Sequence, residues 1–242
     1  MRAMIFAAGL GTRLRPLTND RPKAMVEVNG MPLLEIVIRR LKYFGISEVV
    51  INIHHFGELI LEFLAEQQYF GIDIAISDER GLLLDTGGGL KKAAPLLGDA
   101  PFLVHNVDVI SDLNLNELFA FHSRSKALAT LALRKRNSSR YLLFDENGIL
   151  SGWRNVKTGE RKICRKTAMY EDFAFSGIHV IDPRIFDFVP EEEVFSIIEV
   201  YLNAGQSEVI QGFDHSEGLW LDVGKLPAVK KAEAIIDKIP GG

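Results

Sequence analysis

Short apolar segments alternate with helical patterns over the first half of the chain. The first apolar segment, residues 3–8, is continuous rather than alternating, which is typical of a strand that is buried on both faces. Further strand-like segments span 48–53, 72–77 and 101–106, and helical patterns span 33–44, 56–66, 87–97 and 114–125. Strands that alternate with helices of this length predict a Rossmann-like α/β fold with a mainly parallel sheet flanked by helices.

The second half of the chain has a different pattern. Segments 127–135, 141–144 and 149–153 are strand-like with a turn at 145–148, so we expect a small antiparallel insertion. Residues 154–166 hold six Lys or Arg and one Glu in a poor pattern, and we expect a mobile loop or a phosphate-facing flap there. Later strands are expected at 173–181, 208–211 and 219–223, and helices at 184–188, 195–204 and 226–238. Because no repeat or linker interrupts these elements, we expect one domain over residues 1–242.

Composition excludes several classes of protein. The 47% hydrophobic and 25% charged residues are ordinary for a folded globular chain. The 28 Lys plus Arg against 32 Asp plus Glu give a net charge of −4, so no overall field favours nucleic acid or an anionic membrane. The single cysteine, Cys164, excludes an internal disulfide and favours a reducing compartment, the cytoplasm. No apolar stretch approaches the roughly 18 residues of a membrane span, so we expect neither nucleic acid nor a membrane as a partner.

A glycine-rich, basic segment follows the first expected strand. Gly9 and Gly11 permit positive φ and let backbone N–H groups approach a phosphate at the end of the strand. Residues 1–25 contain five Lys or Arg and one Asp, a local charge of +4 in a chain whose net charge is −4. The segment therefore predicts a polyphosphate-binding loop, and the alternative is a basic surface loop with turn glycines.

Two familiar phosphate-binding loops do not fit this segment. A dinucleotide-binding turn needs a third glycine where this chain has Leu14, and Arg13 and Arg15 crowd the place where a helix must pack closely. A Walker A loop needs Gly-x-x-x-x-Gly-Lys-Ser/Thr, which no window of the sequence supplies. Nicotinamide and P-loop chemistry are therefore disfavoured.

The segment resembles the signature of the sugar-1-phosphate nucleotidyltransferases, which make nucleotide sugars from an NTP and a sugar 1-phosphate. The resemblance rests on Gly9-x-Gly11-Thr12-Arg13, Pro16-Leu17-Thr18, Arg21-Pro22-Lys23, Thr86-Gly87-Gly88-Gly89, Asn106-Val107-Asp108 and Trp220-Leu221-Asp222-Val223-Gly224. It covers residues 1 to about 112 strongly and about 173 to 238 moderately. It implies the nucleotide-diphospho-sugar transferase fold, in which residues 1–125 would bind nucleotide, 126–225 would bind sugar and a helix over 226–238 would close the chain.

The resemblance also implies which residues hold the nucleotide. Lys23 would contact the α-phosphate, and Arg13 would hold the β- and γ-phosphates, so both are candidate catalytic residues. The remaining nucleotide-binding candidates are Ala8, Gly9, Gly11, Thr12, Thr86, Gly87 and Asn106. The less favoured alternative for the Thr86 segment is a loop with a helix N-cap.

Two aspartates follow expected strands at the end of the sheet where open α/β proteins bind ligands. Asp108 follows 101–106 and Asp222 ends the segment 219–223, whereas Asp112 is a weaker candidate. A lone aspartate at such a place is more often a turn former or a helix N-cap. The resemblance instead implies that Asp108 and Asp222 bind Mg²⁺, which prefers one or two carboxylates together with phosphate oxygens and water.

The sugar-phosphate side departs from the family pattern. Its Glu-Lys-Pro element is absent, and Arg154 and Lys157 are candidates to replace that lysine. Ser176 and Gly177 match the sugar-side strand and are stronger candidates. Val107 stands where many relatives have glycine, and we expect it to narrow the approach of the ribose or to shift the metal.

The implied reaction transfers a nucleotidyl group from an NTP to a sugar 1-phosphate and releases pyrophosphate. No general base is required, because the attacking phosphate is already dianionic near neutral pH. The short chain resembles most the members that join UTP to N-acetylmuramate 1-phosphate or a related hexose 1-phosphate, with GTP and mannose 1-phosphate as the alternative. The sequence also leaves open CTP with phosphocholine, caged by Trp153 and Tyr170, and a non-catalytic nucleotide-sugar-binding regulator. We expect a monomer or a small homo-oligomer.

Overall fold

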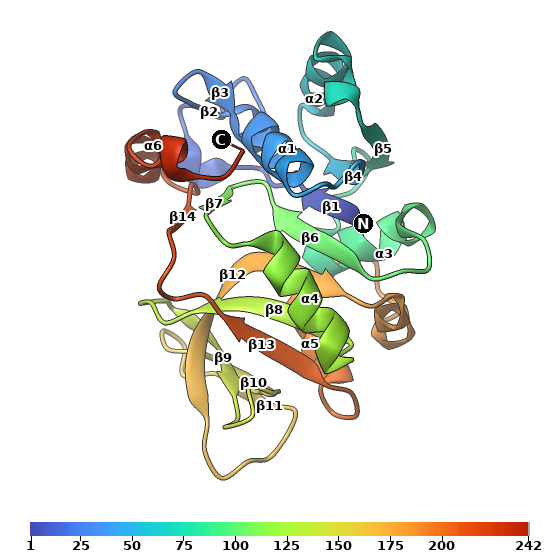
Figure 1. Ribbon diagram of the computed structural model, residues 1–242, viewed down its shortest axis with the longest axis vertical. Coiled ribbons are helices and arrows are strands. Elements are labelled where there is room, and N and C mark those ends of the chain that lie inside the picture. The colour runs from blue at the N-terminus through green and yellow to red at the C-terminus, as the bar shows by residue number, and fades with distance from the viewer. Residues whose placement is uncertain (242) are drawn as a thin grey trace.

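A mixed sheet runs through the molecule in the computed structural model, which describes residues 1–241 (Figure 1). Its strands are β1 (Arg2–Phe6), β4 (Glu48–Ile53), β5 (Asp73–Asp78), β6 (Phe102–Asn106), β8 (Ala129–Arg134), β9 (Arg140–Phe144), β10 (Leu150–Asn155), β11 (Arg161–Ile163), β12 (Glu171–Ile181) and β13 (Ile210–Asp214). Their order is β11-β10-β9-β12-β6-β1-β4-β5, and β8 pairs with β12 and β13. Two smaller sheets pair β2 (Glu27–Val28) with β3 (Met31–Pro32), and β7 (Val109–Ser111) with β14 (Trp220–Asp222).

Helices and short 3₁₀ turns connect these strands. The α-helices are α1 (Leu33–Tyr43), α2 (Gly57–Glu66), α3 (Asp85–Leu97), α4 (Leu115–Ser125), α5 (Ile197–Ala204) and α6 (Leu226–Glu233). The 3₁₀ turns are η1 (Thr12–Leu14), η2 (Lys23–Met25), η3 (Gln68–Gly71), η4 (Pro183–Phe188) and η5 (Ile236–Lys238).

Strand direction divides the sheet into two parts. Strands β5, β4, β1 and β6 are parallel, as the strand and helix alternation predicts. Strand β12 then joins β6, β8 and β9 in antiparallel pairs, and β9, β10 and β11 form an antiparallel meander. The Rossmann-like fold with flanking helices and an antiparallel insertion is therefore confirmed.

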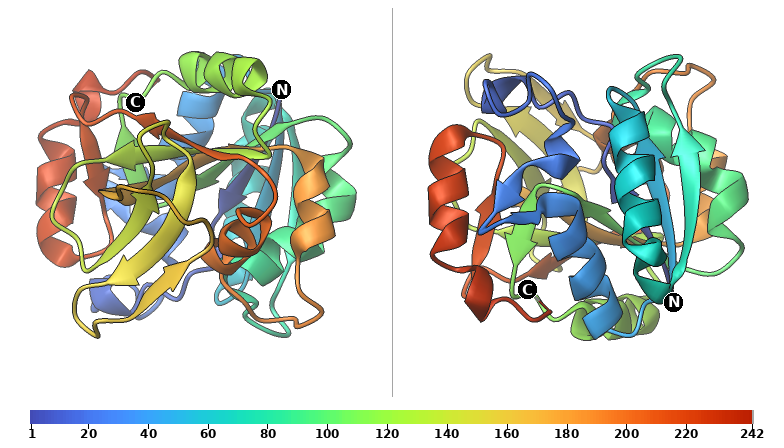
Figure 2. Two further views of the ribbon diagram at one scale, coloured as in Figure 1. Left: turned by 90° about the horizontal axis from the view of Figure 1, so that it is seen from below. Right: turned by 90° about the horizontal axis from the view of Figure 1, so that it is seen from above.

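Strand β1 is buried on both faces because helices cover both sides of the parallel strands. Ala3 and Ile5 belong to the core cluster that includes α1, whereas Met4 and Phe6 belong to the cluster that includes α3. Figure 2 shows α1 and α2 on one side of the parallel strands and α3 on the other. The continuous apolar pattern of residues 3–6 follows from this arrangement, since both alternating sets of side chains face a core.

Strand β1 is shorter than its apolar pattern predicts. We expected it to reach residue 8, but it ends at Phe6. The reason is the hydrogen bonding of the next two residues, because the N–H groups of Ala7 and Ala8 donate to the side-chain oxygen of Asn52 rather than to a neighbouring strand. The chain leaves the sheet at this point and enters the glycine-rich loop.

The basic segment 154–166 is part of a β-hairpin, so the prediction of a mobile loop is wrong. Strand β10 extends to Asn155 and pairs with β11, with Arg154 opposite Arg161 and Gly152 opposite Ile163. A Cβ on Gly152 would lie 2.5 Å from the carbonyl oxygen of Lys162, so glycine allows the two strands to approach closely. The charged side chains hide the alternation of this hairpin in the sequence.

The C-terminal third differs from its pattern in detail. The helix expected over 226–238 divides into α6 and η5, because the N–H of Ile235 bonds to the carbonyl of Ala232 in a 3₁₀-type contact. The segment expected as a helix over 184–188 is the 3₁₀ turn η4, and β13 begins two residues later than expected, at Ile210. Among residues 1–241, no helix has both the length and the apolar character that crossing a membrane would need.

Candidate active site

The glycine-rich loop leaves β1 at the carboxyl end of the parallel strands. Its backbone is fixed by Thr18, whose hydroxyl donates to the carbonyl of Gly11 at 2.9 Å. Gly11 has a φ of +63°, and a Cβ there would lie 3.0 Å from the Cβ of Lys23, so glycine lets Lys23 pack against the loop. Gly9 is exposed and has no atom within 4 Å of its Cβ position. The loop can therefore receive a bulky anion at close range.

Two buried polar side chains hold this loop against the sheet. Asn52 lies near the end of β4, and its Oδ1 accepts from the N–H groups of Ala7 and Ala8 at 2.6 and 3.3 Å. Its Nδ2 donates to Oε1 of Glu79 at 2.7 Å. Glu79 is only 1% exposed, and burial raises the pKa of its carboxyl group. Neither residue was among the candidates predicted from the sequence. The available signal was that Asn52 interrupts the apolar run of β4 and that Glu79 directly follows β5.

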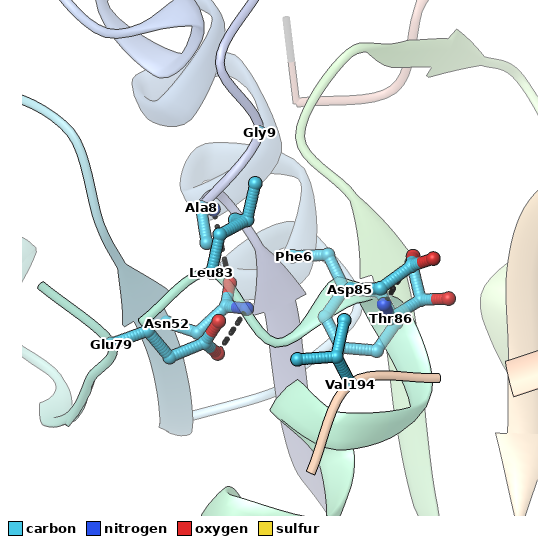
Figure 3. A pocket seen from close by; sticks show the side chains of 9 residues that line it. All are labelled: Phe6, Ala8, Gly9, Asn52, Glu79, Leu83, Asp85, Thr86 and Val194. Atoms are coloured by element: carbon cyan, nitrogen blue, oxygen red, sulfur yellow. Dashed lines mark hydrogen bonds between the residues drawn. The ribbon is translucent and has the colours of Figure 1, made fainter. Parts of the chain in front are cut away.

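A cavity of about 360 Å³ lies between this pair and the start of α3 (Figure 3). It is lined by Phe6, Ala8, Gly9, Asn52, Glu79, Leu83, Asp85, Thr86 and Val194. Its size and its mainly apolar walls with a few polar groups suit a planar ring system. The structure thus brings the predicted residues Ala8, Gly9 and Thr86 to one cavity.

The glycines after Thr86 serve packing. The N–H of Gly87 donates to the carbonyl of Phe195 at 2.9 Å, and the hydroxyl of Thr86 accepts from the N–H of Ile197 at 3.0 Å. A Cβ on Gly89 would lie 2.7 Å from Oε1 of Glu79, so this glycine leaves room for the buried pair. The segment therefore joins the start of α3 to the turn before α5, and Gly87 faces that turn.

Asp108, Asp222 and Lys23 meet next to the loop. Asp222 ends β14 opposite Val109, and the N–H of Val223 donates to the carbonyl of Asp108 at 2.8 Å. The ammonium of Lys23 forms a salt bridge with the carboxylate of Asp108. Burial, and then the charge of Asp108, raise the pKa of Asp222. Two carboxylates from distant segments are thus held together beside one lysine.

Arg13 lies close to Asp222 in this cluster. A Cβ on Gly224 would lie 2.5 Å from Oδ1 of Asp222 and 3.0 Å from Nη2 of Arg13, so the glycine leaves that space open. Oδ1 of Asp222 is buried and has no hydrogen-bond partner within residues 1–241. A buried carboxylate oxygen without a partner is costly unless a ligand satisfies it. Over the same residues, no cluster of three or more His, Cys, Asp or Glu side chains suits a metal ion.

Val107 does not narrow the site. Its side chain is 3% exposed and packs in the core cluster that contains α1, and its N–H donates to the carbonyl of Phe6 at 3.1 Å. The expectation that Val107 would restrict the ribose is therefore wrong, because the side chain points into the core and not into a cavity.

Asn106, Ser176 and Gly177 lie side by side where β6 pairs with β12. Gly177 has a φ of +76°, and a Cβ there would lie 2.7 Å from Nδ2 of Asn106. The Ser176 side chain is 1% exposed, and its hydroxyl is 2.7 Å from Nε2 of His215. The Ser176 carbonyl accepts from Nε1 of Trp220 at 2.9 Å. Ser176 and Gly177 thus contribute packing where β6 meets β12. Their contact with a ligand stays a prediction.

A second cavity, the basic cleft, has a volume of about 760 Å³. It is lined by Arg13, Arg136, Asn137, Ser138, Ser139, Val156, Lys157, Leu221, Asp222, Lys225, Pro227, Ala228 and Lys231. The predicted residue Lys157 therefore faces the same cleft as Arg13 and Asp222. The sequence analysis missed Arg136, Lys225 and Lys231, since only folding brings α6 and the segment after β8 together.

Arg154 and the two aromatic cage candidates face other partners. Arg154 lies in a separate cavity and forms a salt bridge with Asp172. The guanidinium of Arg161 lies 4.5 Å from the ring centre of Tyr170, and the ammonium of Lys162 lies 5.8 Å from that of Trp153. These aromatic faces already carry cations of the chain, which disfavours a cage for a choline head group.

Comparison with known proteins gives the family. The model of the nucleotidyl transferase family matches residues 2–238. The chain is 33% identical to the N-acetylmuramate alpha-1-phosphate uridylyltransferase of Neisseria meningitidis serogroup B, over 97% of this chain and 98% of that one. It is 34% identical to the enzyme of the same name from Caulobacter vibrioides, over 96% of this chain and 95% of that one.

More distant matches agree with this result. Mannose-1-phosphate guanyltransferase of Yarrowia lipolytica is 30% identical over 93% of this chain, which spans 61% of that longer protein. A crystal structure of a putative glucose-1-phosphate thymidylyltransferase from Bacillus anthracis superimposes with a TM-score of 0.81 at 20% identity, over 99% of this chain and 96% of that one, which shows the shared fold. The chain therefore belongs to the nucleotidyl transferase family, as one of its sugar-1-phosphate nucleotidyltransferases.

Proposed function

We propose that the chain transfers the uridylyl group of UTP to N-acetylmuramate 1-phosphate, giving UDP-N-acetylmuramate and pyrophosphate. The observation that carries the reaction is the meeting of Lys23 and Arg13 with Asp108 and Asp222 beside the glycine-rich loop. The choice of substrates is supported by the uridylyltransferases that the chain matches over almost its whole length and theirs. The mannose-1-phosphate guanyltransferase is less similar, at 30% identity against 33% and 34%, so GTP with mannose 1-phosphate is the second candidate pair.

The paired carboxylates suit a divalent cation, and we assign Asp108 and Asp222 as ligands of Mg²⁺. The fit rests on Oδ1 of Asp222, which is buried without a partner, and on the raised pKa that the neighbouring Asp108 helps to cause. Mg²⁺ typically uses one or two carboxylates and completes its shell with water and phosphate oxygens, so a third protein ligand is not needed. When bound, the cation would neutralise charge on the transferring phosphoryl group.

Lys23 and Arg13 bind and orient the triphosphate in this proposal. Lys23 exchanges its salt bridge with Asp108 for the α-phosphate, where negative charge changes during transfer. Arg13, next to Asp222, holds the β- and γ-phosphates together with the backbone of residues 9–12. The acceptor phosphate attacks without a general base, because its second pKa is about 6.

The cavity of Figure 3 holds the nucleobase in this proposal. Asn52 links its wall to the phosphate loop, since one side chain bonds both to Glu79 and to the N–H groups of Ala7 and Ala8. Base and triphosphate are therefore positioned relative to each other by a single buried side chain. The acceptor sugar occupies the basic cleft, which Arg13 of the same loop lines.

Pyrophosphate release tests the proposal. UTP, GTP, dTTP and CTP are each combined with Mg²⁺ and N-acetylmuramate 1-phosphate, mannose 1-phosphate, glucose 1-phosphate or phosphocholine. We expect the fastest release from UTP with N-acetylmuramate 1-phosphate. A faster GTP and mannose 1-phosphate pair would replace the proposed substrates. If no pair releases pyrophosphate while calorimetry shows tight nucleotide binding, a non-catalytic regulator would be favoured.

A further inference from the structure

The basic cleft contains more positive charge than a sugar 1-phosphate needs. Its lining includes the cations Arg13, Arg136, Lys157, Lys225 and Lys231 and a single carboxylate, Asp222. Arg13 and Asp222 are assigned to the triphosphate and the metal, which leaves four cations for the acceptor. A phosphate monoester brings at most two negative charges. The remaining cations would face one another across the cleft unless the acceptor carries a further anion.

Arg136 is placed to bind the phosphate of the acceptor. Its guanidinium lies 4.3 Å from the ring centre of Trp220, two residues before Asp222. Nη2 donates to the carbonyl of Phe175 at 3.2 Å, while Nε is buried without a partner within residues 1–241. The ring and this hydrogen bond fix the planar group, as recognition of a phosphate requires. Arg136 therefore belongs to the end of the cleft near the metal-binding carboxylates.

Lys157 lines the same cleft from a different segment of the chain. It sits in the turn that follows β10, whereas Asp222, Lys225 and Ala228 come from β14 and the start of α6. This turn is fixed, because the N–H of Val156 donates to the carbonyl of Ser139 at 2.9 Å and the N–H of Lys157 donates to Oδ1 of Asn155 at 3.0 Å. Because Arg136 is assigned to the phosphate, the exposed ammonium of Lys157 on this fixed turn is available for a substituent of the sugar.

We propose that Lys157 binds a carboxylate on the acceptor sugar and selects acceptors that carry both a 1-phosphate and a second anion. The inference rests on the proposed function for the orientation of the acceptor. Ser138 and Ser139, which line the cleft beside this turn, add hydroxyl donors for the same group. Neutral hexose 1-phosphates leave Lys157 without a partner and bind more weakly.

The test compares acceptors that carry the second anion with acceptors that do not. N-acetylmuramate 1-phosphate is compared with the uncharged amide of its lactyl group and with N-acetylglucosamine 1-phosphate. KM is measured from pyrophosphate release, and the dissociation constants of the acceptors are measured by calorimetry. Because an exposed ion pair contributes modestly, we expect the wild-type chain to favour the acid over the amide by about fivefold.

Variants then assign this preference to one side chain. Lys157→Gln should remove the preference for the acid, and Lys157→Glu should reverse it. Lys166→Gln is the matched control, because Lys166 is also an exposed lysine but does not line the cleft. The Lys166→Gln protein should prefer the acid over the amide as strongly as the wild type does. Arg136→Gln should weaken the binding of the acid and of the amide by the same factor, since both acceptors carry the phosphate.

The outcomes separate the two proposals. If the acid and the amide bind equally to the wild type, or if Lys157→Gln keeps the preference, the inference is overturned even when UTP and N-acetylmuramate 1-phosphate react. If another nucleotide is the donor but the preference exists and depends on Lys157, the inference holds and the choice of UTP is wrong. Should no nucleotide react, the calorimetric acid-to-amide ratio decides, and a ratio near one overturns the inference.

Discussion

The cavity of Figure 3, which we propose holds the nucleobase, is bordered by buried hydrogen bonds between Asn52, Glu79 and the loop backbone. The cations of the basic cleft are long side chains, and all except the half-buried Arg136 are exposed. In the cavity, the positions and directions of these polar groups are set before any ligand binds, because they are buried and hydrogen-bonded to one another. In the cleft, Lys157, Lys225 and Lys231 are exposed. Such side chains attract anions through charge, which salt screens. One side of the site is thus specified by geometry and the other by electrostatics.

The difference has a physical origin in the two halves of the sheet. Strands β1 and β4 lie between helices on both faces, so a polar side chain at their ends is buried and must be satisfied. The insertion β9–β11 forms one edge of the sheet and supplies Val156 and Lys157 to the cleft from its outer turn. We therefore expect substitutions on the two sides to act on different quantities.

The carboxylates between the two sides should give the largest effect. Asp222→Asn should lower kcat by at least about 10³-fold, because it removes one of the two carboxylates that we assign to Mg²⁺, and this cation would stabilise the transition state. Its melting temperature should not fall, since burial and the charge of Asp108 already raise the pKa of Asp222 and disfavour its ionised form. Pyrophosphate release and thermal unfolding measure both effects.

Asp112→Asn provides the matched control for this substitution. Asp112 lies four residues after Asp108 but lines neither the cavity nor the basic cleft, so turnover should stay within about threefold of the wild type. An Asp222→Asn protein with near-normal turnover would remove Asp222 from the metal site.

Lys23→Ala should have the next largest effect. Lys23 is held beside Asp108 and is assigned to the α-phosphate, so its loss should lower kcat by roughly 10²- to 10³-fold. The KM for UTP should rise less than about tenfold, because the loop and Arg13 still hold the other phosphates. Steady-state kinetics with UTP varied at saturating acceptor separates the two constants. A change confined to KM would mean that Lys23 binds the ground state and the transition state equally.

Asn52→Ala sharpens the comparison between the two sides. It removes the acceptor of two N–H groups and the donor to Glu79, so the KM for UTP should rise about 10- to 100-fold while the KM for the acceptor changes little. The free energy of unfolding should fall by about 1–3 kcal/mol, because buried polar groups lose their partners. Lys157→Gln should show the opposite pattern, with an altered acceptor KM and unchanged stability. Equal changes in both KM values for Asn52→Ala would contradict the separation.

The sequence predicted the parts of the site that are local in the chain. Gly9, Gly11 and Lys23 follow one strand closely, and Asp108 and Asp222 each end a short apolar run, so their positions relative to the sheet could be inferred from pattern and resemblance. The structure brings Lys23, Asp108 and Asp222 together, as that inference requires. The strands of the parallel half were also predicted closely, because burial on both faces makes their apolar runs continuous.

The parts that escaped prediction depend on contacts between distant segments. Asn52 and Glu79 form a hydrogen bond only because β4 and β5 are neighbours in the sheet, and the sequence of neither segment predicts this contact. Arg136 comes from the segment after β8, and only its contact with the distant Trp220 fixes it within the cleft. Arg154 was a candidate for the sugar phosphate, but the antiparallel pairing places it beside Asp172. Short-range patterns do not contain these relations.

The last expected effect acts on stability rather than on turnover and concerns the junction of the two sides, where β6 pairs with β12. His105 and His179 lie on these strands, and burial lowers the pKa of each to about 3; the charges of Arg40 on His105 and of His105 on His179 act in the same direction. Nδ1 of His179 lies 2.7 Å from the hydroxyl of Tyr201. Nδ1 of His105 lies 2.8 Å from the carbonyl oxygen of Asn106, and its Nε2 lies 3.5 Å from Nη1 of Arg40.

Lowering the pH should therefore destabilise the fold before the two histidines are protonated in the folded chain. Below pH about 6.5 the unfolded chain binds protons at these histidines, whereas the folded chain stays neutral there until pH about 3. Stability contributed by the two groups is fully present above pH about 6.5 and falls as the pH decreases, by about 1–2 kcal/mol for each between pH 7 and 5. Urea unfolding at both pH values measures this loss. His179→Gln should reduce it and the exposed His55→Gln should not; an unchanged pH dependence in His179→Gln would place the acid sensitivity elsewhere in the fold.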